Sequence, residues 1–431
     1  MNRPLSRRSF LGVAAGSTAA LALSGCGGGS GGAGDDKTIR MTWWGGDARN
    51  TAYLKSIELF KKANAGVTIT PQYGGYDGYF DKFNTEVAGG KPADLVQMDT
   101  ALFKGYVEKG VLLPLDQHLA PSSLPLYKPL IEAGTVDGKF YGVSSGTGAA
   151  LATFDKTVLD KLKVEPPADT WTWDDMAAKA KEIAKAMGSG KYGIADSGGD
   201  DENFVVFLRQ RKKDLYTPDG KLGFVAADLE EWWTYWEELR KSGACVPSKI
   251  STEARADDSA LPILSGLAPL TLGTGLEVKL PPLTKNELHF VPAPTGQGGV
   301  EGNYLSAGVL LTVTKTSKAA ALAAKLAGWF ATDPETIRTM GITRGIPPSE
   351  TAAKELTPTL DAAQKRAVET TSLVAERVEK AGLGNRVAAP AAGGEIKELM
   401  VRFNDEVGYG RLTVADAAKR LIEEGEKALA G

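Results

Sequence analysis

The chain has 431 residues, and its 50 Lys and Arg against 53 Asp and Glu give a formal net charge of −3. This length exceeds what one compact core holds, so it predicts two or more lobes. A mildly acidic chain without basic blocks argues against nucleic acid as a partner. With only two cysteines and two histidines, we expect neither a disulfide framework nor a metal site, and no cofactor.

The first 25 residues resemble a twin-arginine export signal. Arg7 and Arg8 stand just before an apolar run over residues 11–23. That run is shorter than the roughly 20 residues a helix needs to cross a bilayer, and a basic start before a short apolar run is typical of an export signal. We therefore expect residues 1–25 to direct the protein out of the cytoplasm.

The residues that follow resemble the attachment site of a bacterial lipoprotein. Leu23, Ser24 and Gly25 precede Cys26, which in such proteins receives diacylglycerol and becomes the new N-terminus. The Gly- and Ser-rich stretch after it has the composition of a flexible tether. Residues 26–36 are thus predicted to be a lipidated linker, and two acyl chains suffice for stable anchoring to the cell membrane.

From residue 37 the pattern alternates between strands and helices. Apolar runs at 38–44, 67–70 and 93–98 predict strands, and helical spacing predicts helices after Asp47 and over 80–87. Such alternation is typical of a parallel sheet with helices on its faces. Ligands of open sheets gather at the carboxyl ends of the strands, so the residues after each strand are candidates for a binding site.

The middle and end of the chain also predict strands and helices, with longer connections between them. Residues 149–154, which follow a Gly- and Ser-rich stretch, predict a strand, and the nearly all-apolar residues 308–314 predict a strand buried on both sides. Thr172 and Asp175 predict a capping box at the start of a helix. The last 40 or so residues predict helices, with a second capping box at Thr413.

An ordered series of segments resembles the extracellular solute-binding proteins of ABC importers, in the group that takes up sugars. The resemblance covers nearly everything after residue 37. It lies in the opening strand with Trp43-Trp44-Gly45 and in residues 76–83, 89–96, 138–143, 154–156, 173–176, 305–314, 328–335 and 344–349.

This resemblance implies an α/β, two-lobed periplasmic-binding-protein-like fold of type II. Each lobe would be a mostly parallel sheet flanked by helices, and a hinge would join them. The N-terminal lobe would comprise residues 37–147 with 306–347, and the C-terminal lobe residues 148–305 with 348–431. Gly146 and Gly148 suit a crossing segment whose backbone dihedrals change during closure.

The implied function is capture of a sugar or short oligosaccharide between the lobes, and its delivery to the membrane-spanning subunits of an ABC permease. Only the closed form contacts the ligand from both sides, so binding would favour closure. The protein would be a monomeric receptor without enzymatic activity, anchored outside the cytoplasm through Cys26.

A sugar site needs aromatic rings for the flat C–H faces and polar groups for the hydroxyls. The candidates are aromatic or polar residues at strand ends and crossings: Trp43, Trp44, Gly45, Asp47, Arg49, Tyr76, Asp99, Ser145, Asn203, Thr274, Asn303, Tyr304 and Arg344. One departure from the resemblance concerns residues 273–276, where many relatives carry a sugar-stacking Trp and this chain has none.

Two alternatives stay open from the sequence. A receptor for a charged solute, such as a peptide, an amine or a phosphate ester, is one; Arg49 and Arg344 would favour an anion. An exported glycoside hydrolase is the other, and it would need two carboxylates about 5–9.5 Å apart.

Overall fold

The structure is a computed structural model that describes residues 36–390 and 392–430. The predicted export signal, Cys26 and all of the predicted linker except Asp36 lie outside the described residues. No helix in the described part of the chain is both long and apolar enough to cross a membrane.

A five-stranded sheet is built from the first third of the chain and one later strand. Its order is β2-β1-β3-β11-β6, with β1 parallel to β2 and β3, and β11 antiparallel to β3 and β6. The strands are β1 (Thr38–Trp44), β2 (Thr68–Gly74), β3 (Leu95–Met98), β6 (Gly142–Ser144) and β11 (Leu310–Val313).

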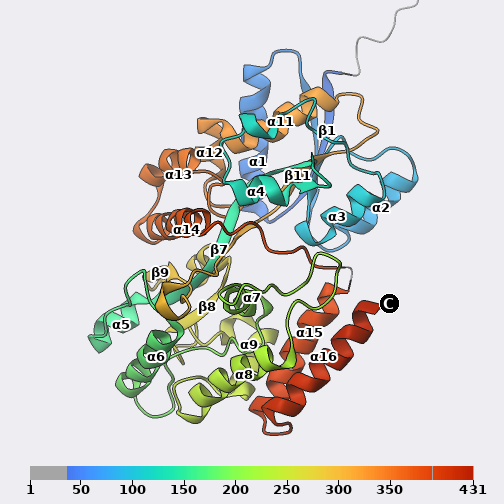
Figure 1. Ribbon diagram of the computed structural model, residues 1–431. Helices are drawn as coiled ribbons and strands as arrows, with labels where there is room; N and C mark the ends of the chain where they lie inside the picture. The colour runs from blue at the N-terminus through green and yellow to red at the C-terminus, as the bar shows by residue number, and fades with distance from the viewer. Residues whose placement is uncertain (1–35, 391, 431) are drawn as a thin grey trace, which may run out of the picture. The chain divides into compact units, whose positions relative to one another are not determined.

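Both faces of this sheet are covered because its strands alternate apolar side chains between two cores. Ile39, Met41 and Trp43 pack with α1 and α11, whereas Trp44 and Val96 pack with α2 and α3 on the opposite face. Figure 1 shows α1 and α11 beside β1 and β11. The helices are α1 (Asp47–Ala63), α2 (Tyr79–Ala88), α3 (Thr100–Glu108), α4 (Lys128–Ala133), α11 (Ala320–Thr332), α12 (Pro334–Met340) and α13 (Glu350–Leu356).

A second sheet forms around β7 (Thr147–Asp155), a nine-residue strand that is buried throughout. β7 pairs antiparallel with β8 (Leu270–Thr274), β9 (Leu288–Pro292) and β10 (Leu305–Ala307). The expectation of a mostly parallel sheet is therefore wrong here. The physical reason is that β8, β9 and β10 return beside β7 from distant parts of the chain and all run opposite to it, so the pairing direction is set by the tertiary fold and not by the local strand and helix pattern.

The second sheet is likewise covered on both faces. Ala150, Ala152 and Phe154 of β7 share a core with α6, α7, α8, α15 and α16, and Ala149 and Leu151 face a core that includes α14. The remaining helices are α5 (Lys156–Leu162), α6 (Trp173–Met187), α7 (Asp201–Arg209), α8 (Ala226–Lys241), α9 (Ser248–Ala256), α10 (Leu276–Lys279), α14 (Ala362–Lys380), α15 (Gly393–Gly408) and α16 (Val414–Ala430).

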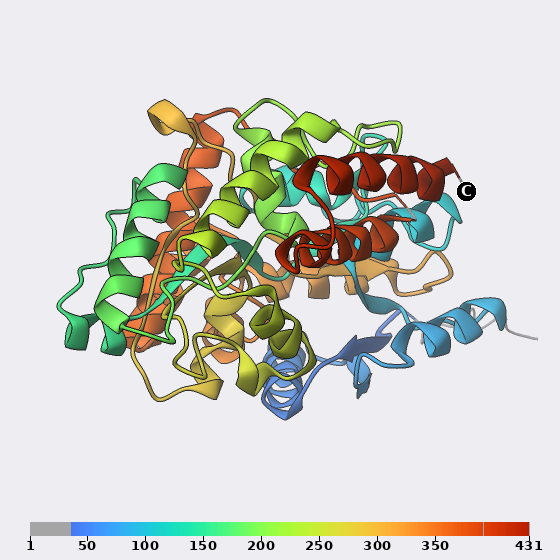
Figure 2. The ribbon, with the colours of Figure 1, turned by 90° about the horizontal axis from the view of Figure 1, so that it is seen from below.

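The last two helices lie against the middle of the chain. In Figures 1 and 2, α15 and α16 lie side by side, with α8 next to them. Short elements complete the structure: the hairpin β4 (Thr135–Val136) and β5 (Lys139–Phe140), and the 3₁₀ turns η1 (Pro121–Ser123), η2 (Asp258–Ala260), η3 (Pro281–Leu283), η4 (Gln297–Gly299) and η5 (Thr357–Thr359).

Three segments that connect the two sheets meet at one place. Thr147 and Ile346 exchange backbone hydrogen bonds of 2.7 and 2.8 Å, and the Gly308 amide donates to the Gly146 carbonyl at 3.0 Å. A Cβ at Gly146 would lie 2.1 Å from the Arg344 carbonyl oxygen, so only glycine permits this approach. The three backbones therefore form one tight crossing.

Candidate functional site

An aromatic ring and a carboxylate meet where the parallel strands of the first sheet end. We call Trp44, Tyr76 and Asp99 the strand-end cluster. The Tyr76 ring meets the Trp44 ring edge-on at 5.4 Å, and its hydroxyl donates to Asp99 Oδ2 at 3.1 Å. Asp99 Oδ1 also caps α3 by accepting from the Ala101 amide. Tyr76 is 50% exposed, so one face of its ring is open to a solute.

Trp43 and Trp44 differ in their packing because adjacent strand residues point to opposite faces. The Trp43 ring is fully buried, stacked between Tyr53 and Tyr73 at 4.8 and 4.9 Å. Its Nε1 donates to Asn50 Oδ1 at 3.0 Å. Trp43 therefore packs in the core in this structure, while the Trp44 ring meets the Tyr76 ring edge-on.

The loop after β1 holds three further predicted residues. Gly45 makes room for Arg49, since a Cβ there would lie 2.3 Å from Arg49 Cδ. Arg49 donates through Nε to the Thr343 carbonyl at 2.9 Å. Asp47 is exposed in the first turn of α1, and the cap of that helix is Gly46. The Asp47 carboxylate is thus open to solvent just after β1, the strand that ends at Trp44.

Arg344 ties the first sheet together from inside. Only 6% exposed, it donates to the Tyr53 hydroxyl at 3.0 Å, the Trp44 carbonyl at 2.9 Å and Gln97 Oε1. Burial lowers the pKa of Arg344 to about 10. Its guanidinium is committed to these acceptors, which makes it a structural cation rather than an open anion site.

Three more predicted residues lie near the crossing. Asn303 is fully buried; its amide oxygen accepts from the Ala150 and Tyr304 amides, and its nitrogen donates to the Ala150 carbonyl. Tyr304 is buried, its hydroxyl has no hydrogen-bond partner among the described residues, and burial raises its pKa. Ser145 is half-buried, and its hydroxyl has no partner within the described chain.

Carboxylates gather at the start of α7 and beside β8. We call Asp200, Asp201, Glu202 and Glu277 the acidic cluster. Glu202 accepts from the Thr274 hydroxyl, which places one predicted residue at the cluster. Asn203, another predicted residue, is fully buried and neither atom of its side-chain amide is hydrogen-bonded within the described chain.

Two cations face the acidic cluster, and burial perturbs its acids. Arg386 lies 3.9 Å from Glu202, and Lys397 lies 3.7 Å from Asp201. The pKa of Asp200 is raised to about 7 by burial and by repulsion from Glu202 and Asp201. The pKa of Glu277 is raised to about 7 mainly by burial. Lys397 acts in the opposite direction on the pKa of Asp200, but burial and the two neighbouring acids outweigh it.

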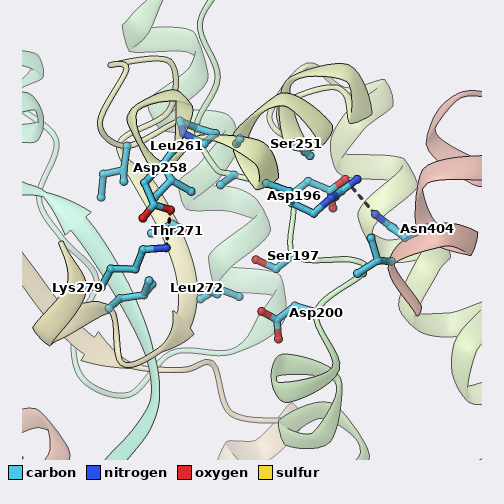
Figure 3. A pocket seen from close by; sticks show the side chains of 18 of the residues that line it. Asp196, Ser197, Asp200, Ser251, Asp258, Leu261, Thr271, Leu272, Lys279 and Asn404 are labelled. Atoms are coloured by element: carbon cyan, nitrogen blue, oxygen red, sulfur yellow. Dashed lines mark hydrogen bonds and ion pairs between the residues drawn. The ribbon is translucent and has the colours of Figure 1, made fainter. Parts of the chain in front are cut away.

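A pocket of about 470 Å³ opens beside this cluster. Asp200 and Asp201 line it from the start of α7, Thr271 and Leu272 from β8, and Lys397 from α15. Figure 3 shows the Asp200 carboxylate pointing from the start of α7 toward β8. The volume of this pocket lies in the range of small-molecule sites.

None of the thirteen predicted residues lines this pocket. Trp44, Tyr76 and Asp99 are brought together at one place, and Asn203, Thr274 and Tyr304 border the acidic cluster. Sequence reasoning missed Asp200, Asp201, Glu202, Glu277 and Arg386. Three consecutive acids before the apolar run 204–208 were a visible signal for the first three. Glu277 and Arg386 come near only through the tertiary fold.

The described residues offer no metal site, since nowhere among residues 36–390 and 392–430 do three His, Cys, Asp or Glu side chains come together to hold an ion. What the arrangement offers is hydrogen-bond acceptors, an open aromatic ring and charged groups. These suit reversible binding of a polar solute.

Comparisons with known proteins also point to the binding of a solute. The model of the family described as "Bacterial extracellular solute-binding protein" matches residues 55–368. A binding protein from Brucella abortus is 24% identical over 277 residues, which are 63% of this chain and 66% of that protein. The chain thus spans just under two thirds of the length of this relative.

Two solved structures share the fold. An extracellular solute-binding protein of family 1 from Alicyclobacillus acidocaldarius has a TM-score of 0.77 and 24% identity, covering 91% of this chain and 98% of that one. The sugar-binding protein MalE from Xanthomonas citri has a TM-score of 0.75 and 19% identity, covering 91% and 97%. The expected α/β periplasmic-binding-protein fold is therefore confirmed.

Proposed function

Because the chain belongs to the bacterial extracellular solute-binding proteins, the non-catalytic receptors of ABC importers, we propose that it captures a sugar or short oligosaccharide. The captured solute would pass to the membrane-spanning subunits of a permease. The site's acids would act as hydrogen-bond acceptors, with no covalent step. The similar MalE structure is described as a sugar-binding protein, which supports this choice.

The strand-end cluster is the observation that best supports a carbohydrate ligand. A half-exposed Tyr76 ring, held edge-on by Trp44, stands beside the Asp99 carboxylate. A sugar needs this pairing, because its C–H face packs on a ring while its hydroxyls donate to a carboxylate. Asp47, exposed just after β1, offers a further acceptor at the same edge of the sheet.

The crossing supports a receptor that closes on its ligand. We propose that residues 37–147 with 306–347 form one lobe and residues 148–305 with 348–431 the other. Three backbones hydrogen-bonded at Gly146, Thr147 and Gly308 then confine the change of dihedral angles to a short hinge.

We also propose that the protein is a monomer held outside the cytoplasm by a lipid on Cys26, after export by the twin-arginine route. The export route and the anchor follow from the sequence of residues 1–36. Growth in radiolabelled palmitate tests it, since label should enter the wild-type protein and be absent from a Cys26→Ala variant.

A panel of mono- and oligosaccharides, titrated by calorimetry, tests the ligand. At least one sugar should bind without being consumed. Tyr76→Ala should weaken the binding free energy of that sugar by about 1–3 kcal/mol, because the substitution removes both a ring face and a hydroxyl near Asp99. Tyr409→Ala is the matched control, since Tyr409 is another exposed tyrosine, at 41%, on the end of α15.

The results separate clearly. Binding lost in Tyr76→Ala and kept in Tyr409→Ala supports the strand-end cluster. If every sugar in the panel fails to bind the wild-type protein, the carbohydrate proposal is wrong. If any oligosaccharide is cleaved, the receptor assignment itself is wrong.

A further inference from the structure

Tyr73 is a second exposed aromatic ring at the end of the first sheet, and it is not among the thirteen predicted site residues. It lies on β2, directly opposite Trp43 in the parallel register, and it is 49% exposed. Tyr76, which is 50% exposed, follows it three positions later. A single exposed tyrosine would need no explanation, but two large half-exposed rings in one short loop do.

The Tyr73 ring is held in place by a column of stacked groups. It stacks on the Trp43 ring at 4.9 Å with 20° between the planes, and Trp43 stacks on Tyr53 at 4.8 Å with 23°. The Arg344 guanidinium lies over the Tyr53 ring at 4.7 Å and donates to the Tyr53 hydroxyl at 3.0 Å. Trp43 and Tyr53 are fully buried, so they cannot shift easily. Tyr73 is the exposed member of the column, and its orientation is therefore set before any ligand arrives.

Tyr73 and Tyr76 are supported from opposite faces of the same sheet. Trp43, on which Tyr73 stacks, packs with α1 and α11. Trp44, which Tyr76 meets edge-on at 5.4 Å, packs with α2 and α3. Three residues of fully extended chain span at most about 11 Å, so both tyrosines lie within reach of one elongated solute at the carboxyl end of the sheet. A single sugar ring covers the face of one tyrosine, and a second sugar ring is needed for the other.

The backbone between the two rings carries no side chains. Gly74 and Gly75 connect Tyr73 to Tyr76, and the Gly74 carbonyl accepts from the Gly45 amide at 2.9 Å. A Cβ added at Gly74 or Gly75 would meet no heavy atom of a non-adjacent residue within 4 Å, and neither glycine has a positive φ. Neither crowding nor backbone conformation therefore requires glycine here. Glycine is also the residue that lets a ligand approach the backbone closely, and that use fits both positions.

We propose that Tyr73 is a specificity-determining residue that binds a second sugar ring, so that the receptor prefers an oligosaccharide to a monosaccharide. The sugar chain would cross the carboxyl end of the sheet over the two glycines, with one sugar ring against Tyr76 and a more distant one against Tyr73. Asp99, which accepts from the Tyr76 hydroxyl, and the exposed Asp47 after β1 offer acceptors to the sugar hydroxyls. The inference rests on the proposed receptor function and narrows its ligand.

Calorimetry with maltotetraose, cellotetraose, xylotetraose and arabinotetraose, each beside its own mono- and disaccharide, tests the preference for length. At least one tetrasaccharide should bind the wild-type protein more tightly than its shorter homologues. Tyr73→Ala should weaken that tetrasaccharide about 2- to 12-fold, which corresponds to the loss of one aromatic contact. The variant should leave the affinity for the shortest homologue that binds unchanged, whereas Tyr76→Ala should weaken both.

Further variants separate the loss of the ring from a loss of folding. Tyr73→Phe keeps the stacked ring and should keep the wild-type affinity, and Tyr409→Ala removes another exposed tyrosine and should change no affinity. Gly75→Val places a branched side chain where the structure has open space, so its melting temperature should stay that of the wild type. It should nevertheless weaken the tetrasaccharide at least about tenfold, because the side chain blocks the path between the rings. Should Tyr73→Ala not fold, Gly75→Val replaces it.

The outcomes distinguish the inference from the function on which it rests. If monosaccharides bind as tightly as tetrasaccharides, the preference for length is wrong and the sugar receptor stands. The same holds if a folded Tyr73→Ala variant binds the tetrasaccharide like the wild type, or weakens short and long sugars equally. If no sugar of any length binds the wild-type protein, the carbohydrate proposal is wrong, and the role of Tyr73 is overturned with it.

Discussion

Arg344 has the right chemistry to bind a ligand, but all of its observed hydrogen bonds go to acceptors within the protein. Its guanidinium joins β1, β3 and α1 through Trp44, Gln97 and Tyr53. Asn303 does the same on β7 by bonding both polar groups of Ala150. At the scale of one residue, burial and satisfied hydrogen bonds separate such structural groups from Tyr76, Asp47 and Asp200, which keep open faces or free oxygens.

Glu277 makes the stability of the protein depend on pH. Glu277 is 1% exposed and its carboxyl oxygens have no hydrogen-bond partner among residues 36–390 and 392–430. Burial raises its pKa from 4.5 to about 7 in the folded state. The folded state therefore binds more protons than the unfolded state between these values. Stability is full below about pH 4.5 and falls as the pH rises toward 7, by about 3 kcal/mol for this group.

Glu277→Gln should remove that part of the pH dependence. Urea unfolding at pH 5 and pH 8 measures it, and the variant should lose less stability between the two than the wild type. Asp200, whose pKa is also raised to about 7, contributes to the pH dependence that stays in the variant. Glu369→Gln, at an exposed position on α14, controls for the loss of one negative charge. An unchanged difference in Glu277→Gln would contradict the burial argument.

At the scale of elements, sequence patterns predicted where strands and helices lie. The runs at 38–44, 93–98, 149–154 and 308–314 became β1, β3, β7 and β11, and the capping box at Thr172 begins α6. These features are local, so periodicity and cap chemistry suffice. Pairing direction and side-chain burial are not local. Trp43 is covered because Tyr53 and Tyr73 arrive from α1 and β2.

The candidate site could be predicted from the sequence only where its residues follow predicted strands. Tyr76 and Asp99 follow strands, so the rule of strand ends found them. Glu277 and Arg386 lie on segments separated from α7 by many elements, and only packing brings them to Glu202. A list of polar residues cannot distinguish them from the chain's other acids and cations.

The crossing should be sensitive to a single methyl group. Gly146→Ala would place a Cβ 2.1 Å from the Arg344 carbonyl oxygen, and the required backbone shift should destabilise the protein by about 1–3 kcal/mol. Gly105→Ala, inside α3 with no heavy atom within 4 Å of the added Cβ, should instead stabilise by about 0.5–1 kcal/mol. Denaturant midpoints measure both. Equal stability of Gly146→Ala and wild type would show that the backbones separate freely.

At the scale of the whole molecule, the proposed closure has two separate signatures. A ligand at a hundred times its Kd should stabilise the folded state by about 2.7 kcal/mol. Closure should also reduce the radius of gyration measured by small-angle X-ray scattering. A stabilised protein whose scattering curve does not change would be a receptor that binds without closing, contrary to the hinge proposed at Gly146.

The position of β11 has a consequence for the order of synthesis. It lies between β3 and β6 in the five-stranded sheet, although more than 160 residues separate it in sequence from the end of β6 at Ser144. A ribosome must therefore translate past Val313 before that sheet can complete its hydrogen bonds. Until then β3 and β6 each expose an unpaired edge, which is a template for aggregation. The nascent polypeptide would therefore carry these unpaired strand edges while residues 145–313 are being synthesised.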